Sequence, residues 1–440
     1  MGQVPEHWGI LALRRVLIEP LSNGLFKKRE YWGTGVKIVN VFDAYVKSDV
    51  VDETSLDRVI CDDSEIEKYL VQHGDFVFVR SSLKLEGIGK VASILKPSEE
   101  IIFECHLVRG RPDTKKVDPK FLCYFLNSSY SRQLLISSSN QVTMATIDQE
   151  KIKSLVIAIP KISEQITIAR FLDYKTAQID ALIANKELLL KKLAQKRTAI
   201  ISHAVTKGLD PSAPMKDSGV PWLGEIPNNW DSKRIKFVVS YIGSGKTPRG
   251  GTEVYISEGI MLLRSQNIYD DGLRLDDAVF ITDEADMQQS SSRVKPFDVL
   301  LNITGASIGR TSIVPEIFHN ANVNQHVCIM RPNKRLINPE YLHLLMCSQQ
   351  AKDQIIAQEN GTSREGLNFY QVGNLIFAFP SITNQNQIIL YIKNSTARLD
   401  AMKNKVIMAI KKLKEYRISL ITHAVTGKID VRGFKQYPNQ

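Results

Sequence analysis

The strongest constraint on the fold is a duplication within the chain itself. A stretch that begins at Ile159, IPKISEQITIARFLDYKTAQIDALIANKELLLKKLAQKRTAIISHAVTKGLD, is matched by one that begins at Phe379, FPSITNQNQIILYIKNSTARLDAMKNKVIMAIKKLKEYRISLITHAVTGKID. The two align without a gap at a constant offset of 220 positions, through to Asp210 and Asp430. A repeat of this length predicts a structure that is built twice from equivalent parts.

The offset also holds upstream, where His106 matches His326 and Lys90 matches Arg310. The two openings, VPEHW and IPNNW, match at an offset of 222. Each half therefore reads as a globular part followed by a long helical segment. We divide the chain into a first globular domain at residues 1–158, a first helical segment at 159–207 and a linker at 208–223. A second globular domain at residues 224–378, a second helical segment at 379–430 and a tail at 431–440 follow.

The globular parts are predicted to be α+β, with mixed helices and strands. Short β-branched and aromatic runs at residues 75–80, 101–103, 298–304 and 323–330 alternate with turn residues, which favours a small, irregular sheet. Residues 121–135 and 340–356 each have the periodicity of one amphipathic helix.

The helical segments carry their own start and stop signals. Pro160 and Pro380 precede them, Ser163 and Thr383 are the expected N-caps, and Gly208 and Gly427 are the expected ends. At about 1.5 Å per residue, roughly 43 residues form a rod of about 65 Å.

Apolar residues along each rod predict a seam for a partner helix. In the second rod they are Leu399, Met402, Val406, Ala409, Leu413, Tyr416 and Leu420. In the first rod they are Ile179, Leu182, Leu189, Leu193 and Ile200. We predict that the two rods pair as an antiparallel coiled coil that separates the globular domains. The alternative is that each helix packs into a separate core.

Composition is that of a globular protein with basic helices. The chain is 43% apolar and 24% charged, has no run of membrane-span length, and begins without a signal-peptide pattern, so we expect a cytoplasmic protein. Five cysteines without metal-ligand spacing predict reduced thiols and no zinc site. The net charge is +10, and the two helical segments account for it, which suggests a polyanionic partner.

The sequence GSGKTPRGG, residues 243–251, contains a fragment of a nucleotide-binding phosphate loop. The first glycine of the full pattern is replaced by Ser240, and Pro248 and paired glycines oppose the helix that must follow. We therefore expect a basic loop here and keep nucleotide hydrolysis as a weaker alternative. No other catalytic constellation is present in the sequence, and His106 and His326 are expected to be structural.

Basic and amide side chains gather in the loops of the globular parts. Arg, Lys, Asn and Gln are the residue types that contact base edges and phosphates, although solvated loops contain them too. The candidates for DNA contact are Lys27, Lys28, Arg29, Arg80, Lys84 and Lys90 in the first domain, and Lys246, Arg249, Arg264, Gln266, Asn267, Asn302 and Arg310 in the second. Because basic residues recur in both domains, we expect the two domains to contact two separated stretches of one DNA duplex.

With these residues in view, the chain resembles the DNA-specificity subunit of type I restriction-modification enzymes. The resemblance rests on the I-P-x-x-W openings, the junction KGLDPSAPMKDSGVPWLGEIPNNW, the loop GSGKTPRGG with LLRSQNI and VLLNITGASIGR after it, and the ending ITHAVTGKIDVRG. It implies two target recognition domains, each reading half of a bipartite, asymmetric site. It also implies helical spacers that set the unread gap, so that about four inserted residues lengthen the gap by one to two base pairs.

The resemblance implies a non-catalytic subunit in a host-defence complex. Methyltransferase subunits supply S-adenosylmethionine and adenine-N6 DNA methylation, and a restriction subunit supplies ATP-dependent, magnesium-dependent cleavage. In the first half, residues 21–35 and 80–90 replace the second half's GSGKTPRGG and ITGASIGR, so the two domains are expected to read different sequences. The rival interpretation is a free-standing DNA-binding regulator or scaffold.

Overall fold

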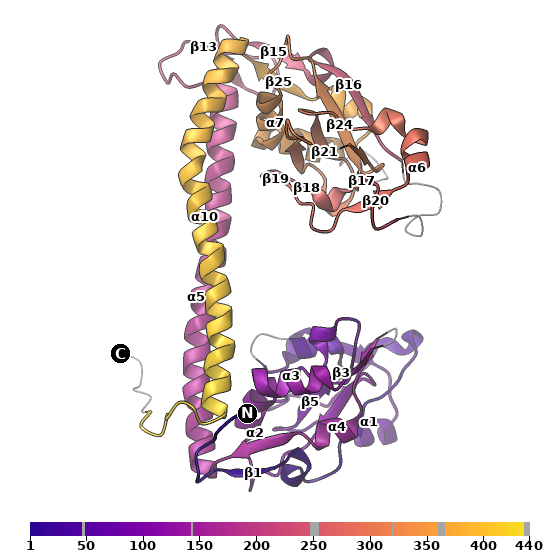
Figure 1. The fold of residues 1–440 in the computed structure, drawn as a ribbon, viewed down its shortest axis with the longest axis vertical. Helices are drawn as coiled ribbons and strands as arrows, with labels where there is room; N and C mark the ends of the chain where they lie inside the picture. The colour runs from indigo at the N-terminus through magenta and orange to yellow at the C-terminus, as the bar shows by residue number, and fades with distance from the viewer. Residues whose placement is uncertain (46–48, 142–143, 247–254, 319, 360–365, 435–440) are drawn as a thin grey trace. The chain divides into compact units, whose positions relative to one another are not determined.

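Each helical segment forms one long helix, α5 at Ile162–Lys207 and α10 at Ile382–Val425 (Figure 1). The computed structural model describes residues 1–45, 49–141, 144–246, 255–318, 320–359 and 366–434. The chain divides into two compact units. Unit 1 contains residues 1–187 and 408–440, and unit 2 contains residues 188–407. Each unit therefore combines one globular part with segments of both long helices.

The helix ends agree with the predicted glycines, whereas the starts differ. Gly208 and Gly427 follow the helices with φ values of +77° and +71°, the left-handed conformation that ends a helix. Both helices begin one residue before the predicted N-caps, so Ser163 and Thr383 lie in the first turn. In α10 the hydroxyl of Ser381 instead accepts the Asn384 N–H at 3.4 Å.

The Pro-x-x-Trp opening of each repeat packs against the glycine that ends the other repeat's helix. A Cβ placed on Gly427 would lie 2.3 Å from Pro5 and 3.3 Å from Trp8, and one on Gly208 would lie 3.3 Å from Trp230. The approach explains why both helices end in glycine. The start of each repeat therefore contacts the helix end of the other repeat, and each unit contains parts of both repeats.

The described strands of unit 1 form small sheets with strand orders β2-β9-β5-β7, β4-β3-β8, β10-β11-β6 and β1-β12. The strands are β1 Gly9–Ala12, β2 Ser22–Asn23, β3 Trp32–Val39, β4 Asp57–Val59, β5 Phe76–Val79, β6 Ser81–Ser82, β7 Val91–Ser93, β8 Ile101–Phe103, β9 Leu107–Gly110, β10 Asn140–Gln141, β11 Ala145–Thr146 and β12 Val156–Ile159. The short helices are α1 Asp63–Tyr69, α2 Pro119–Asn127, α3 Ser129–Ser137 and α4 Gln149–Lys153.

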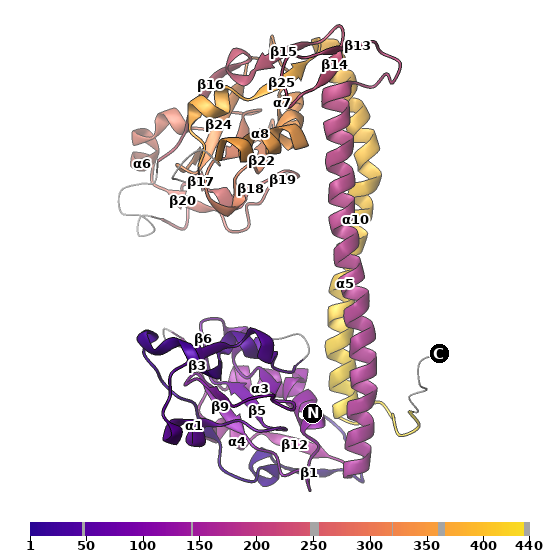
Figure 2. The same cartoon turned by 180° about the vertical axis from the view of Figure 1, so that it is seen from behind.

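Unit 2 repeats the two main sheets as β16-β24-β21-β22 and β20-β17-β23 (Figure 2). The strands are β13 Met215–Asp217, β14 Glu225–Pro227, β15 Asp231–Arg234, β16 Val239–Ser244, β17 Ile260–Leu263, β18 Ile268–Tyr269, β19 Gly272–Leu273, β20 Val279–Ile281, β21 Val299–Asn302, β22 Thr311–Ile313, β23 Ala321–Val323, β24 Val327–Pro332 and β25 Ile376–Phe379. The helices are α6 Asp283–Gln288, α7 Pro339–Cys347, α8 Gln349–Glu359 and α9 Phe369–Gly373.

The predicted strand at residues 323–330 is wrong as one element. It contains the end of β23, a turn at residues 324–326 and the first part of β24. The turn is closed by the Asn324 side chain, which accepts the His326 N–H at 3.1 Å. His326 lies in this turn and His106 in its counterpart, because in each case a side-chain acceptor two residues earlier, Asn324 or Glu104, reverses the chain.

Each predicted amphipathic helix is in fact two helices. Ser128 divides α2 from α3, and Ser348 divides α7 from α8. Both serines are fully buried and donate a 2.6 Å hydrogen bond to a carbonyl three residues earlier, Phe125 and Leu345 respectively. The hydroxyl competes with the helical hydrogen-bond ladder and turns the chain.

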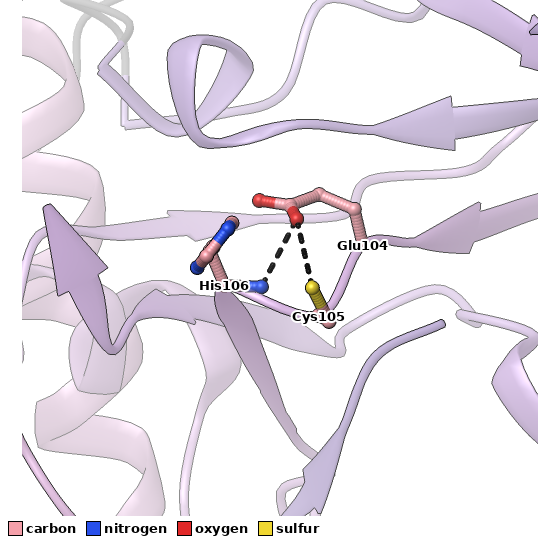
Figure 3. Close-up of side chains that lie close together, drawn as sticks. All are labelled: Glu104, Cys105 and His106. Carbon is pink, nitrogen blue, oxygen red and sulfur yellow. Dashed lines mark hydrogen bonds between the residues drawn. The ribbon is translucent and has the colours of Figure 1, made fainter. Parts of the chain in front are cut away.

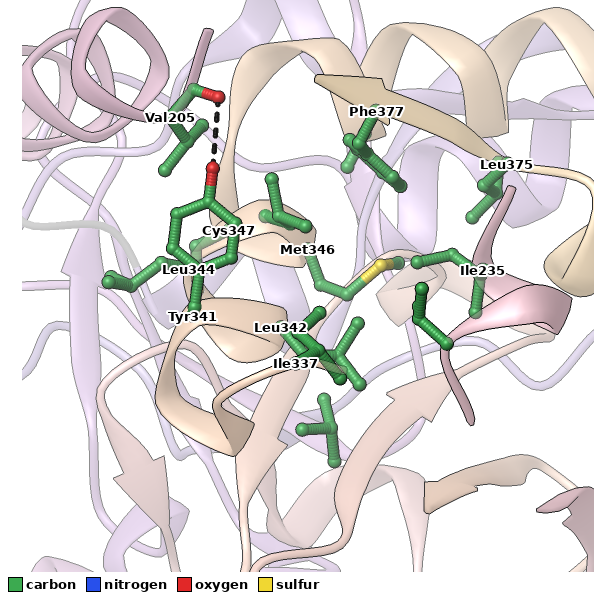
Figure 4. Close-up of a cluster of buried hydrophobic side chains, with 14 of the residues drawn as sticks. Val205, Ile235, Ile337, Tyr341, Leu342, Leu344, Met346, Cys347, Leu375 and Phe377 are labelled. Atoms are coloured by element: carbon green, nitrogen blue, oxygen red, sulfur yellow. Dashed lines mark hydrogen bonds between the residues drawn. The ribbon is translucent and has the colours of Figure 1, made fainter. Parts of the chain in front are cut away.

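The core of unit 2 joins its sheet, α7 and the end of α5, as Figure 4 shows. Tyr341 of α7 is fully buried and donates a 3.3 Å hydrogen bond to the carbonyl oxygen of Val205 in α5. Leu223 and Ile226 belong to the same core, so the segment after α5 is packed into unit 2, with β13 and β14 paired antiparallel.

The long helices run antiparallel within each unit, as predicted. In unit 1, Arg417 Nε lies 3.1 Å from Asp180 Oδ1, and Phe434, further along the chain, contacts Phe171, nearer the start of α5. In unit 2, the equivalent pair, Arg197 and Asp400, is separated by 3.5 Å. The same residue pair thus joins α5 to α10 twice.

The predicted seam is correct at alternate positions and wrong at the others. Leu399, Val406 and Leu420 are buried, whereas Met402 and Tyr416 are exposed by 40% and 55%. In α5, Leu182 and Leu189 are likewise exposed. The positions that face inward instead are one residue later, and they include Ile183, Ile410 and the ion-paired Arg417. Arg417, paired with Asp180, thus occupies the seam position that the apolar pattern assigns to Tyr416.

Two buried glutamines clamp the starts of the long helices. Gln165 accepts the Asp118 N–H at 2.8 Å and donates to the Pro160 carbonyl at 2.8 Å. Gln385 accepts the Asn338 N–H at 2.8 Å and donates to the carbonyl of Pro380 at 3.1 Å. Both side chains are fully buried, so each globular part is fixed to its own helix by a satisfied amide.

Among the described residues, no helix has both the length and the apolar character that a membrane span requires.

Candidate nucleic-acid interface

Each unit contains a hollow formed by three equivalent turns. In unit 2, the polar hollow is lined by Ser265, Gln266, Tyr269, Thr304, Gly305, Ala306, Ser307, Arg310 and His326. In unit 1, the apolar hollow is lined by Val41, Phe42, Tyr45, Ser81, Ser82, Leu83, Lys84, Glu86, Gly87, His106 and Met144. The polar hollow has a volume of about 450 Å³ and the apolar hollow about 710 Å³.

Strand register establishes that the hollows are equivalent. β3 pairs in parallel with β8 as β17 pairs with β23, so that Val39 corresponds to Leu263. A 3-10 turn follows each strand two residues later, at Val41–Tyr45 and Ser265–Asn267. The second wall is the 3-10 turn Leu85–Gly87 in unit 1 and Gly305–Ser307 in unit 2. The third wall is the turn that contains His106 in unit 1 and His326 in unit 2.

Arg310 is the best-placed cation of the polar hollow. Its guanidinium lies 4.8 Å from the centre of the Tyr269 ring and is exposed. No carboxylate of the described residues lies within ion-pair distance of it. A planar guanidinium held over an aromatic ring, with its donors free, is suited to a guanine edge or a phosphate.

Two predicted contact residues in unit 2 are buried and hold the hollow in shape. Asn302 donates to the Ser265 carbonyl at 2.8 Å and to the Ser307 hydroxyl at 3.0 Å, linking two walls. Asn267 donates to Asp277 at 2.9 Å. Because both side chains are fully buried, their amides position the walls and are not presented to a ligand. This corrects the assignment made from their residue type.

Arg264 and Gln266 contact the same acidic residue. Arg264 donates to the Asp277 carbonyl oxygen at 2.7 Å, and Gln266 donates to the Asp277 carboxylate. Gln266 is exposed and lines the polar hollow, whereas Arg264 is partly buried. Lys246 is exposed, and the predicted contact Arg249 lies outside the described residues, as does most of the GSGKTPRGG loop.

In unit 1, the cluster Lys27, Lys28 and Arg29 divides into two kinds of residue. Lys27 Nζ lies 2.7 Å from Glu65 Oε2 and 5.0 Å from the Tyr31 ring centre. The hydrogen bond to Glu65 raises the pKa of Lys27. Lys28 and Arg29 are exposed and form no ion pair with a described residue, so they are the accessible cations of this cluster.

Lys90 has a structural partner. Its Nζ lies 2.6 Å from Asp49 Oδ1, and the Asp49 side chain is only 5% exposed. Lys84 is exposed on the rim of the apolar hollow. Arg80 is partly buried, and its Nε has no hydrogen-bond partner among the described residues. Of these three predicted contacts, Lys84 is the one whose charge faces solvent.

Glu104, Cys105 and His106 are the one group with metal-ligand chemistry in the described residues (Figure 3). Glu104 accepts the His106 N–H at 3.0 Å, closing the turn as Asn324 does in unit 2. Burial raises the pKa of the Cys105 thiol, which opposes the thiolate that a metal requires. The carboxylate therefore serves as a turn acceptor in this structure.

The aromatic and apolar residues of the hollows were not predicted from sequence. Tyr269 and Tyr45 occupy equivalent positions at an offset of 224, and Phe42 corresponds to Gln266. The expected offset of 220 conceals this match because the second repeat has two more residues between its opening and β17, and four fewer between β17 and β23, than the first repeat has at the equivalent places. An alignment that allowed this insertion could have found them.

A family model described as the type I restriction modification DNA specificity domain matches residues 26–192 and 227–412. The chain belongs to this family. The two matches fall on the two repeats, so the specificity domain is present twice in tandem.

Relatives that are named as specificity subunits also match the chain. The chain is 25% identical over 310 residues to the type I restriction enzyme EcoBI specificity subunit of Escherichia coli, covering 69% of this chain and 64% of that protein. It is 26% identical over 281 residues to the putative type I restriction enzyme MjaX specificity subunit of Methanocaldococcus jannaschii, covering 61% and 62%. The matches thus span somewhat less than two thirds of these relatives.

The fold also matches a solved chain from a study titled as the structural basis of complex assembly and conformational transition of the type I R-M system. The TM-score is 0.66 at 13% identity, over 98% of this chain and all of that chain. At this identity the similarity is one of fold alone, and it confirms the predicted fold class.

Proposed function

We propose that this chain is the DNA-specificity subunit of a type I restriction-modification complex, in which each unit reads one half of a bipartite, asymmetric target. The observation that carries the proposal is the pair of equivalent hollows built from the same three turns. Their side chains differ at matched positions, for example Gln266 against Phe42 and Ala306 against Glu86. A duplicated scaffold with unlike linings suits two different half-sites.

The chemistry of the complex is assigned to partners. Methyltransferase subunits would supply S-adenosylmethionine and adenine-N6 transfer, and a restriction subunit would supply ATP- and magnesium-dependent cleavage. Exposed apolar residues on the long helices, including Leu182 and Tyr416 in unit 1 and Met402 in unit 2, offer surface for such partners. In this role the chain itself is non-catalytic and acts in the compartment that holds the DNA, the cytoplasm.

The test is a genome-wide map of N6-methyladenine in cells with and without the gene. Loss of one gapped, asymmetric motif on deletion supports the proposal, and co-purification with a methyltransferase identifies the partner. If no motif changes although such a methyltransferase co-purifies in active form, the specificity role is rejected. Binding of DNA without any such partner would favour a free-standing regulator.

A further inference from the structure

The apolar hollow of unit 1 exposes more large apolar side chains than its counterpart. Phe42 is 82% exposed and Leu83 is 83% exposed, and both lie on its lining. The corresponding residue to Phe42 in unit 2 is the polar Gln266. Exposed apolar side chains gathered around a hollow mark an interaction surface.

Leu83 lies in an insertion that unit 2 lacks. β5 corresponds to β21 at an offset of 223, since Phe76 pairs with Gly110 as Val299 pairs with Met330. β7 corresponds to β22 at an offset of 220, since Phe76 also pairs with Ser93 as Val299 pairs with Ile313. Unit 1 therefore has three extra residues between these strands. They fall at Ser82–Lys84, on the wall of the hollow, because Ser81 pairs with Thr146 as Thr304 pairs with Gly366.

Hydrogen bonds hold this wall in place. The hydroxyls of Tyr45 and Ser82 lie 2.9 Å apart, and the Ser82 hydroxyl donates to the Lys84 carbonyl at 2.7 Å. The Arg132 guanidinium donates to the carbonyl oxygens of Glu86 and Ile88. The wall is thus preorganised, and the inserted Leu83 is held outward by a satisfied polar framework.

The occupant of the hollow follows from its position. The equivalent surface in unit 2 carries Arg310, whose donors suit base edges, and Lys84 supplies a cation for phosphate beside the apolar rim in unit 1. In the major groove, the thymine C5-methyl group is the apolar feature of a base edge. We propose that Phe42 and Leu83 select thymine in the half-site that unit 1 reads, by packing against its methyl group. This inference rests on the proposed function.

The test compares thymine with deoxyuridine, which lacks only the methyl group. Once the motif is known, the full chain in its methyltransferase complex is titrated with duplexes in which each target thymine is replaced by deoxyuridine in turn. We expect at least one replacement in one half-site to weaken binding about fourfold, the effect of one buried methyl group. Phe42→Ala and Leu83→Ala should reduce this thymine-to-uracil ratio toward one.

Ile18→Ala is the control, because Ile18 is an apolar residue of unit 1 that is 65% exposed and does not line the hollow, and it should leave the ratio unchanged. Phe42 and Leu83 are exposed, so their removal should not unfold unit 1. The inference is overturned if the wild-type complex binds its motif but treats thymine and uracil alike, if the motif has no thymine, or if Phe42→Ala retains the full ratio. Loss of complex assembly with an unchanged ratio would assign the hollow to a protein partner instead. Failure to bind any motif would refute the proposed function itself.

Discussion

Lys90 and Arg310 occupy equivalent positions, but neutralising them should have opposite consequences. In Lys90→Gln, the Asp49 carboxylate, 5% exposed, loses the ammonium that lies 2.6 Å away. Breaking a buried ion pair costs about 3–5 kcal/mol. Lys90 is itself 25% exposed, and Arg417 Nη2 lies 3.9 Å from Asp49 Oδ2, so both solvent and a second cation remain. We therefore expect a loss of about 2–3 kcal/mol in the free energy of unfolding.

Arg310→Gln removes an exposed guanidinium whose described contact is the Tyr269 ring at 4.8 Å. An exposed cation–π contact is worth about 0.5–1 kcal/mol, so stability should change by less than about 1 kcal/mol. DNA affinity should fall instead. If Arg310 contacts phosphate, the slope of log affinity against log salt should decrease by about one, and if it contacts a base, one half-site should lose about 1–3 kcal/mol of discrimination.

The assay pairs urea unfolding of the full chain with DNA binding by fluorescence anisotropy over a salt series. Lys90→Gln should shift the unfolding midpoint, and in buffer without urea it should leave DNA binding largely intact. Arg310→Gln should do the reverse. The reasoning is refuted if Lys90→Gln leaves the unfolding midpoint unchanged while it weakens DNA binding as much as Arg310→Gln does.

Three further predictions concern stability. Gln385→Leu leaves the Asn338 N–H and the Pro380 carbonyl without a partner. At about 1–3 kcal/mol for each buried group, it should lower the free energy of unfolding in urea by about 2–6 kcal/mol, and a change below about 1 kcal/mol would contradict the clamp. Burial lowers the pKa of His343 to about 4 from an ordinary 6.5, so the unfolded state binds more protons between these values. Stability from this group is present above pH 6.5 and lost as the pH falls toward 4, by up to about 2 kcal/mol at pH 5, and His343→Gln should flatten that dependence. Glu104→Asn should keep the turn closed because Asn324 closes the equivalent turn, and chelators should not alter the melting temperature; a chelator-dependent loss would restore a metal role.

The sequence alone determined the features that depend on neighbours along the chain. The 220-residue repeat predicted two equivalent units, and Gly208 and Gly427 predicted the helix ends, because a left-handed residue stops a helix wherever it occurs. The apolar period predicted an antiparallel pair, since a long amphipathic helix requires a covered face.

Tertiary structure decided the features that depend on partners distant in sequence. Arg417, and not the predicted Tyr416, lies in the seam because Arg417 has a carboxylate partner in Asp180, 237 residues away, which no local pattern reveals. Residue type suggested that Asn302 and Lys90 contact DNA, but folding buries Asn302 between two walls and places Lys90 against Asp49. A polar side chain is available to a ligand only if the fold leaves its donors unused, and that is settled by contacts in space.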